Sequence, residues 1–455
     1  MKEDLTTCPF TRHLLKTTSY MLVMMVFQTL YFLIDLYWVG RLGTDAVAAV
    51  GIAGNLTFIV LALTQMLGVG TTTVVSHAVG RKQHEEALLL FNQSQVLAMV
   101  TGVLFLVLGL AIRMPYSNAM SADANTARLA GEYLIWMIPA MALQFGLVAM
   151  GAALRGIGNF KTGMIVSSTT IVINMVLAPI LIFGWGTGHA FGVAGAAMST
   201  FVAISVGLLW LLTYFLPRDA YLHFVVADWG PRLALWKRML AIGLPTGFEF
   251  TITAVYLFLV YAITKPFGAA AQAGFGIGGR VVQAGFMPVV ALGFAVAPVA
   301  GQNFGARQSA RVKATFKDAA MMAAAVMFIF TIIANIAPDA MVRVFSKDPA
   351  VIKVGVGYLR IVSLTFIPSG LIFVASSMFQ AMGNTVPSLV ASAVRILLVA
   401  APLPFLTRAA GFQLTWIWYL SATCVLVQLT ISMLLLRREF ARRLGFGERP
   451  PDQSL

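Results

Sequence analysis

Long apolar runs separated by short polar segments dominate the sequence. Each run is about 20 residues or longer, the helix length that crosses the hydrocarbon core of a bilayer. The runs lie at 14–39, 46–76, 89–112, 129–154, 162–184, 191–216, 239–264, 271–301, 319–338, 354–381, 386–407 and 413–436. The pattern predicts an all-α integral membrane protein with twelve transmembrane helices. The first run is too long for a cleavable signal peptide.

The composition excludes an ordinary soluble enzyme and a disordered chain. Hydrophobic residues make up 59% of the 455 residues and charged residues only 11%, whereas soluble domains carry about 25% charged residues. Cys8 and Cys424 give no disulfide framework, and the five histidines form no zinc motif. No paired acids or Ser/His arrangement falls within the spans, so a membrane-embedded enzyme ranks last. We expect no metal and no cofactor apart from a coupling ion.

The net charge of +14 is explained by membrane topology. With a cytoplasmic N-terminus, 20 Lys and Arg residues fall in inside segments, 8 in outside segments and 3 within helices. The positive-inside rule then places both termini in the cytoplasm. We therefore expect a multi-pass protein of the cytoplasmic (inner) membrane, with lipid around it, no nucleic-acid partner and no obligate protein partner.

The second half of the sequence repeats the first at an offset of 225 residues. The matches include Gly43 with Gly268, Gly80 with Gly305, Tyr133 with Tyr358, and Gly158–Asn159 with Gly383–Asn384. Because each half has six predicted helices, both halves have the same orientation in the membrane. Two parallel repeats imply two lobes related by a pseudo-two-fold axis along the membrane normal.

The predicted organisation follows from this repeat. It comprises an N-lobe at 1–216, a cytoplasmic linker at 217–237, a C-lobe at 238–437 and a cytoplasmic tail at 438–455. A pair of helical bundles can enclose a cavity and alternate its opening. This organisation favours a transporter.

Two acidic residues, Asp35 and Glu249, lie well inside predicted spans. A carboxylate in lipid costs about 2.5–3.5 kcal/mol on insertion scales. It can relieve this cost by taking up a proton, by binding Na⁺ or a cationic substrate, or by pairing with an arginine. Candidate charge partners for Glu249 are the arginines within spans, Arg280, Arg360 and Arg395.

Polar residues of the fifth and sixth spans could surround Asp35. Asn174 lies in the fifth span and Thr200 in the sixth. They predict a polar cluster that binds a coupling cation or substrate together with Asp35. The alternative is that they form hydrogen bonds that only hold helices together.

Several motifs resemble those of the multidrug and toxic compound extrusion (MATE) family along nearly the whole chain. They are YFLIDLYWVGRLGTDAVAAVG, GVGTTTVVSHAVGRKQHEEA, GAALRGIGNF, NMVLAPILIFGWG, GVAGAAMST, PVAGQNFGARQ and FQAMGNTVP. The resemblance implies a twelve-helix, two-lobe antiporter without an organic cofactor. Such an antiporter exports amphipathic organic cations in exchange for inward H⁺ or Na⁺.

The DinF-like branch of that family implies particular site residues. Asp35, Asn174 and Tyr133 match three members of its N-lobe cation site, whereas Ala178 stands where the branch has a second aspartate. Tyr20 also stands where that branch has a proline associated with helix bending. The resemblance therefore leaves H⁺ or Na⁺ at Asp35 and Asn174, with the single carboxylate favouring H⁺.

Other branches couple transport through a glutamate on the seventh helix, where Glu249 lies. Two functions remain open at this point. The first is a cation-coupled exporter of amphipathic, cationic compounds. The second is a lipid-linked precursor flippase, or an exporter of an anionic metabolite, on the same fold, in which Arg280, Arg360 and Arg395 hold the anion.

Overall fold

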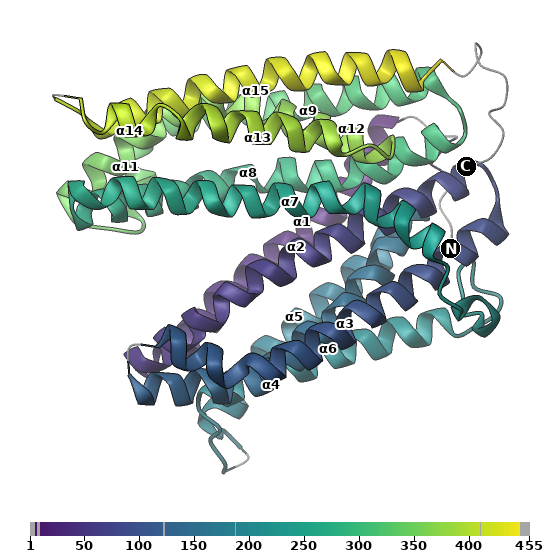
Figure 1. Cartoon of the computed structure of the whole chain (residues 1–455), viewed down its shortest axis with the longest axis horizontal. Helices are drawn as coiled ribbons and strands as arrows, with labels where there is room; N and C mark the ends of the chain where they lie inside the picture. The colour runs from purple at the N-terminus through teal and green to yellow at the C-terminus, as the bar shows by residue number, and fades with distance from the viewer. Residues whose placement is uncertain (1–4, 7–9, 122, 187, 410, 446–455) are drawn as a thin grey trace. The chain divides into compact units, whose positions relative to one another are not determined.

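The computed structural model describes all residues except 1–4, 7–9, 122, 187, 410 and 446–455 (Figure 1). The described residues form helices and irregular segments, with no strand among them. Twelve of their helical stretches are long and apolar enough to cross a membrane. The predicted all-α class with twelve transmembrane helices is therefore confirmed.

The described residues divide into two compact units. The first contains those of Ser19–Gly247, and the second those of Leu5–Thr18 and Phe248–Leu455. The first and seventh long helices, α1 (Phe10–Gly40) and α7 (Leu233–Thr264), are each shared between the units. The division therefore falls within helices, and the segment 217–232 belongs to the first unit.

The first unit is built from long helices joined by short turns. Its other elements are α2 (Thr44–Gly80), α3 (His84–Met120), α4 (Ala124–Gly156), α5 (Phe160–Phe183), α6 (Val193–Phe215) and the 3₁₀ turn η1 (Val226–Trp229). Helix α4 is central, because α2, α3 and α6 all pack against it. Its buried face carries alanines and glycines, which let neighbouring backbones approach closely.

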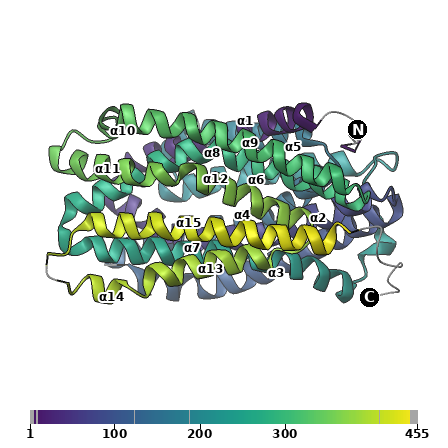
Figure 2. The ribbon, with the colours of Figure 1, turned by 90° about the horizontal axis from the view of Figure 1, so that it is seen from above.

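The second unit contains more and shorter elements. They are η2 (Lys265–Phe267), α8 (Ala269–Gly305), α9 (Ser309–Ile336), α10 (Pro338–Arg343), α11 (Pro349–Val362), η3 (Ser363–Thr365), α12 (Phe366–Ala381), α13 (Val386–Ala400), α14 (Leu403–Leu406) and α15 (Leu414–Arg443). Helix α8 packs against α9, α11 and α12. Helices α13 and α15 run side by side (Figures 1 and 2).

One predicted span of the second unit is interrupted. The run 354–381 becomes α11 and α12, joined by the 3₁₀ turn η3. Pro368 explains the break, because its ring would clash with the carbonyl of Leu364 in a continuous α-helix. The hydroxyls of Ser363 and Thr365 donate to carbonyls three residues earlier and stabilise the turn.

The sequence repeat is also visible in the backbone. Lys82 and Arg307, which are 225 residues apart, both adopt left-handed conformations, with φ of 59° and 57°. At both turns the residue after this position donates its N–H to a carbonyl five residues earlier, at 3.0 Å. The repeat-equivalent Gly158 and Gly383 also share a positive φ, of 83° and 72°. The two halves therefore use the same turns at the same positions.

Two buried amide side chains near the beginning of α3, Asn92 and Gln93, bind the segment between α6 and α7. Asn92 bonds the N–H of Val225 (2.9 Å), the indole N–H of Trp229 (3.1 Å) and the carbonyl of His223 (3.0 Å). Gln93 bonds the N–H of Arg232 (3.0 Å) and the carbonyls of Asp228 (2.6 Å) and Gly230 (2.7 Å). These bonds fix the segment against the first unit.

Candidate functional site

Three helices of the first unit bring polar side chains together at Thr200, and we call Thr200, Asn174, Tyr31 and Asp35 the Thr200 cluster. Asn174 of α5 donates to the Thr200 hydroxyl at 2.9 Å. The Tyr31 hydroxyl of α1 lies 3.4 Å from the same oxygen. Thr200 and Asn174 are both buried, with 7% and 4% of their surface exposed. The predicted pair from the fifth and sixth spans is thus in direct contact.

Asp35 joins this cluster through α1. It lies one helical turn after Tyr31, so the two side chains share a face of the helix. Asp35 lies near the hydroxyls of both Tyr31 and Tyr133, and Tyr133 is buried on α4. Asp35, Asn174, Tyr133 and Thr200, which the sequence singled out, therefore lie in one region of the first unit.

Two oxygens of the cluster retain unused acceptor capacity. Asp35 Oδ1 and Asn174 Oδ1 are both buried, and neither has a hydrogen-bond partner among the described residues. An unpaired buried oxygen costs about 1–3 kcal/mol. Both are acceptors that could receive a proton, a cation or a donor group of a substrate. The buried Ala178 adds only a methyl group, and the described residues contain no group of three or more metal-ligating side chains.

Glu249 lies in the second unit, where two serines of α13 hold its carboxylate. Ser388 donates to Oε2 at 3.0 Å, and Ser392 donates to Oε1 at 2.7 Å. Ser388 also lies 2.8 Å from the hydroxyl of Ser376 on α12. Residues 388 and 392 are one turn apart, so both face Glu249 from the same side of α13.

A chain of hydrogen bonds connects Glu249 to Arg395. Arg395 donates to Gln428 Oε1 at 3.4 Å, and Gln428 Nε2 donates to the Ser392 hydroxyl at 3.1 Å. Ser392 in turn donates to Glu249. The donors thus point consistently toward the carboxylate, which orients the Gln428 amide and the Ser392 hydroxyl. We call these residues the Glu249 chain.

The three candidate arginines lie in different surroundings. Arg395 approaches the ring of Tyr256, with its guanidinium carbon 5.3 Å from the ring centroid. Arg280 and Arg360 are exposed, and within the described part of the chain no ion pair joins either to Glu249. Only Arg395 is connected to Glu249, and the connection is indirect.

Sequence reasoning missed Tyr31, Ser388, Ser392 and Gln428. Signals for three of these existed, since Tyr31 precedes Asp35 by four residues and the two serines have the same spacing. Their partners, however, are more than 100 residues distant along the chain. Such contacts become visible only after the helices have been placed.

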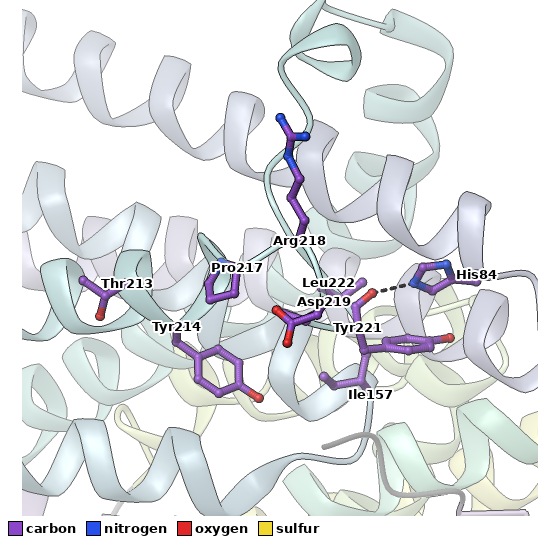
Figure 3. A pocket seen from close by; sticks show the side chains of 10 residues that line it. His84, Ile157, Thr213, Tyr214, Pro217, Arg218, Asp219, Tyr221 and Leu222 are labelled. Atoms are coloured by element: carbon purple, nitrogen blue, oxygen red, sulfur yellow. Dashed lines mark hydrogen bonds between the residues drawn. The ribbon is translucent and has the colours of Figure 1, made fainter.

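One hollow of the first unit is lined by none of the residues of the Thr200 cluster. It has a volume of about 850 Å³ and is lined by the segment after α6 and the beginning of α3 (Figure 3). His84 Nε2 lies 2.6 Å from the Tyr221 carbonyl oxygen beside it. No predicted site residue lines this hollow, so the buried carboxylates are the better candidates for the functional site.

The family model described as MatE matches residues 21–180 and again residues 245–406. These matches cover more than half of the sequence, and the chain belongs to this family of MATE proteins. The two matches are separated by nearly the offset of the internal repeat, which supports the repeat independently.

Individual relatives agree with this family. Over 439 residues the chain is 24% identical to the probable multidrug resistance protein NorM of Thermotoga maritima, covering 92% of this chain and 93% of that protein. It is 23% identical over 375 residues to the FAD transporter of Shewanella oneidensis, with 82% of each covered. A solved structure described as the outward-facing conformation of a multidrug resistance MATE family transporter has a TM-score of 0.89 at 23% identity, covering 97% of this chain and 98% of that chain.

Proposed function

We propose that the protein is a secondary active antiporter that exports amphipathic, cationic organic compounds in exchange for inward H⁺. The observation that carries the proposal is the buried Asp35 carboxylate, whose Oδ1 has no hydrogen-bond partner in the described residues. A carboxylate in a membrane span is costly unless it is used. Family membership and relatives named as multidrug resistance proteins support export of small molecules. We propose that the protein acts as a transporter and needs no cofactor besides the coupling ion.

The composition of the Thr200 cluster favours H⁺ over Na⁺. A proton needs one acceptor, which Asp35 Oδ1 supplies. Hard cations such as Na⁺ are best held by several oxygens, and Ala178 supplies none where a second carboxylate would stand. Asn174 and Thr200 would then orient the site and bind substrate, with Tyr133 closing it from α4.

The proposed topology follows the sequence. Two lobes, joined through the segment at 217–237, would alternate access to the site. Both termini would lie in the cytoplasm and the protein in the inner membrane, because Lys and Arg gather on one side.

The proposal is tested by ethidium transport in proteoliposomes, with a pH gradient and a Na⁺ gradient imposed separately. We expect the pH gradient to drive transport in the wild type and Asp35→Asn to abolish it. Asp45→Asn is the matched control, because Asp45 is an exposed acid at the beginning of α2. Driven transport by Asp35→Asn at the wild-type rate would contradict coupling through Asp35.

Glu249 provides a second candidate for coupling. If Glu249→Gln abolishes driven transport and Asp35→Asn does not, the coupling site lies in the Glu249 chain. Ser392→Ala would then weaken transport as well, since Ser392 donates to Glu249 Oε1 at 2.7 Å. Transport driven only by the Na⁺ gradient would replace H⁺ by Na⁺ as the coupling ion.

One observation favours a second function, the export of an anionic compound. Arg395 Nε is buried and lacks a hydrogen-bond partner among the described residues, and one relative is named as an FAD transporter. Transport of FAD that is lost in Arg395→Gln, together with no transport of ethidium, would support this function over the first.

A further inference from the structure

A groove lies between α9 and α15 in the second unit, where α9 begins and α15 ends. Its volume is about 340 Å³. The residues that line it are mainly apolar and include Phe316, Met433, Leu436 and Phe440, with Lys313 and Arg437 as its cations. Phe316 and Phe440 pack edge to face across it, with ring centroids 5.9 Å apart. The groove thus joins an apolar wall to two positive charges.

Both cations lie near the ends of their helices. Lys313 is on the second turn of α9, and Arg437 is close to the basic end of α15. Phe316 and Met433 lie further into the two spans. Near the helix ends the groove therefore combines both cations with Phe316 and Phe440, and Met433 lies further into the span of α15.

Neither cation has an ion-pair partner among the described residues. Lys313 and Arg437 are both exposed. The neighbouring Arg443, in contrast, pairs with Glu439 at 2.8 Å, and Arg311 donates to Asn303 at 2.9 Å. The basic residues that stabilise the fold are therefore different from the two that line the groove.

We propose that this groove binds an anionic phospholipid, whose phosphate contacts Lys313 and Arg437 and whose acyl chain lies along Phe316 and Met433. Basic pockets between membrane helices bind anionic headgroups. The apolar wall requires an attached chain, which a free phosphate compound lacks. The two unpaired charges require an anionic headgroup. In a zwitterionic lipid the phosphate is accompanied by the lipid's own positive charge. This lipid site is separate from the Thr200 cluster and the Glu249 chain, and it does not depend on the transported compound.

The test is native mass spectrometry of the delipidated full chain in non-ionic detergent, titrated with phosphatidylglycerol or with phosphatidylcholine. We expect wild type to bind phosphatidylglycerol more tightly. The double variant Lys313→Gln/Arg437→Gln should bind it roughly 30-fold more weakly, since each basic residue at a membrane surface contributes about 1 kcal/mol. Lys317→Gln/Arg438→Gln is the matched control, because it removes two exposed charges from the same helices outside the groove.

Other outcomes would overturn the proposal. Equal affinity for both lipids would leave an apolar groove without charge selectivity. Unchanged phosphatidylglycerol binding in the Lys313/Arg437 variant, or equal weakening in the control, would place the lipid elsewhere. Displacement of the lipid by an equal concentration of glycerol 3-phosphate would mean that the groove binds a free phosphate compound instead. Retained binding in Lys313→Arg/Arg437→Lys, which keeps both charges, would support the proposal.

Discussion

Thr200 is the side chain on which the polar cluster of the first unit depends. Its hydroxyl accepts the Asn174 amide and donates to the Ala196 carbonyl at 3.2 Å, and it lies beside the Tyr31 hydroxyl. In a membrane span no bulk water can replace these partners. The Thr200 hydroxyl is therefore the contact that holds side chains of α1, α5 and α6 together near Asp35.

Thr200→Val should destabilise the protein by about 1–3 kcal/mol, because the buried Asn174 amide loses its acceptor. The substitution keeps the shape of the side chain, so packing changes little. Thermal unfolding in detergent measures the loss, and ethidium transport should fall with it. Thr213→Val on the same helix is the control, since Thr213 is exposed and its hydroxyl donates to the Trp210 carbonyl within its own helix. An equal effect of both substitutions would show that Thr200 has no special role.

Asp123 is a charged N-cap residue that lies just before the membrane span of α4. As N-cap of α4, its carboxylate accepts the Thr126 N–H and the Thr126 hydroxyl, both at 2.8 Å. These bonds favour the ionised form and lower the pKa of Asp123. Its contribution to stability is therefore fully present above the unfolded-state pKa of about 3.9 and is lost as pH falls through the lower folded-state pKa.

Asp123→Ala should therefore lower the melting temperature at pH 7, and the difference from wild type should shrink as pH falls below about 4. Thermal unfolding in detergent between neutral and acidic pH measures this difference. Asp123→Asn is the control, because asparagine also caps helices but does not titrate. A difference between wild type and the alanine variant that does not change with pH would contradict the role of the charge.

At the scale of elements, the segment between α6 and α7 is a packed part of the first unit. Asn92 and Gln93 together satisfy six polar groups of this segment. Further along, Gly243 of α7 lies against the Met66 backbone of α2, so closely that a methyl group would not fit. The beginning of α7 is thereby fixed to the first unit.

Asn92→Leu should release this segment. It leaves the Val225 N–H and the Trp229 indole N–H without their acceptor, at a cost of about 1–3 kcal/mol for each group that remains buried. Limited trypsin digestion at Arg218 and Arg232 should become faster. Gln95→Leu on the same helix is the control, because among the described residues the Gln95 side chain bonds Ser94 alone. Equal digestion rates in both variants would show that Asn92 does not hold the segment.

At the scale of the whole molecule, the apolar runs predicted the twelve spans, since the length and polarity of a segment decide whether it can cross a bilayer as a helix. The 225-residue repeat grouped these spans into two halves. The same reasoning identified Asp35 and Glu249 as acids within spans. It did not find the break before Pro368, because the length and mean polarity of the run 354–381 do not register a single proline. It also could not find Ser392 opposite Glu249, since that contact depends on how α7 packs against α13.

The repeat leads to a final prediction for both units together. Lys82 and Arg307 are exposed residues in left-handed conformations at equivalent turns. A side chain costs roughly 1–2 kcal/mol there, which exceeds the entropy that glycine loses on folding, about 0.5–1 kcal/mol. Lys82→Gly and Arg307→Gly should each stabilise the protein by about 0.5 kcal/mol, and the double variant should show the sum, because the positions belong to different units.

A second pair of repeat-equivalent turns, between α4 and α5 and between α12 and α13, provides controls of opposite sign. Gly158 and Gly383 have φ values of 83° and 72°, so Gly158→Ala and Gly383→Ala should each destabilise the protein by roughly 1 kcal/mol. Thermal unfolding in detergent measures all the variants. Destabilisation by Lys82→Gly or Arg307→Gly would mean that the lost side chain contributes more than the backbone strain it imposes. A stabilising Lys82→Gly with a destabilising Arg307→Gly would show that the two halves no longer use their shared turns in the same way.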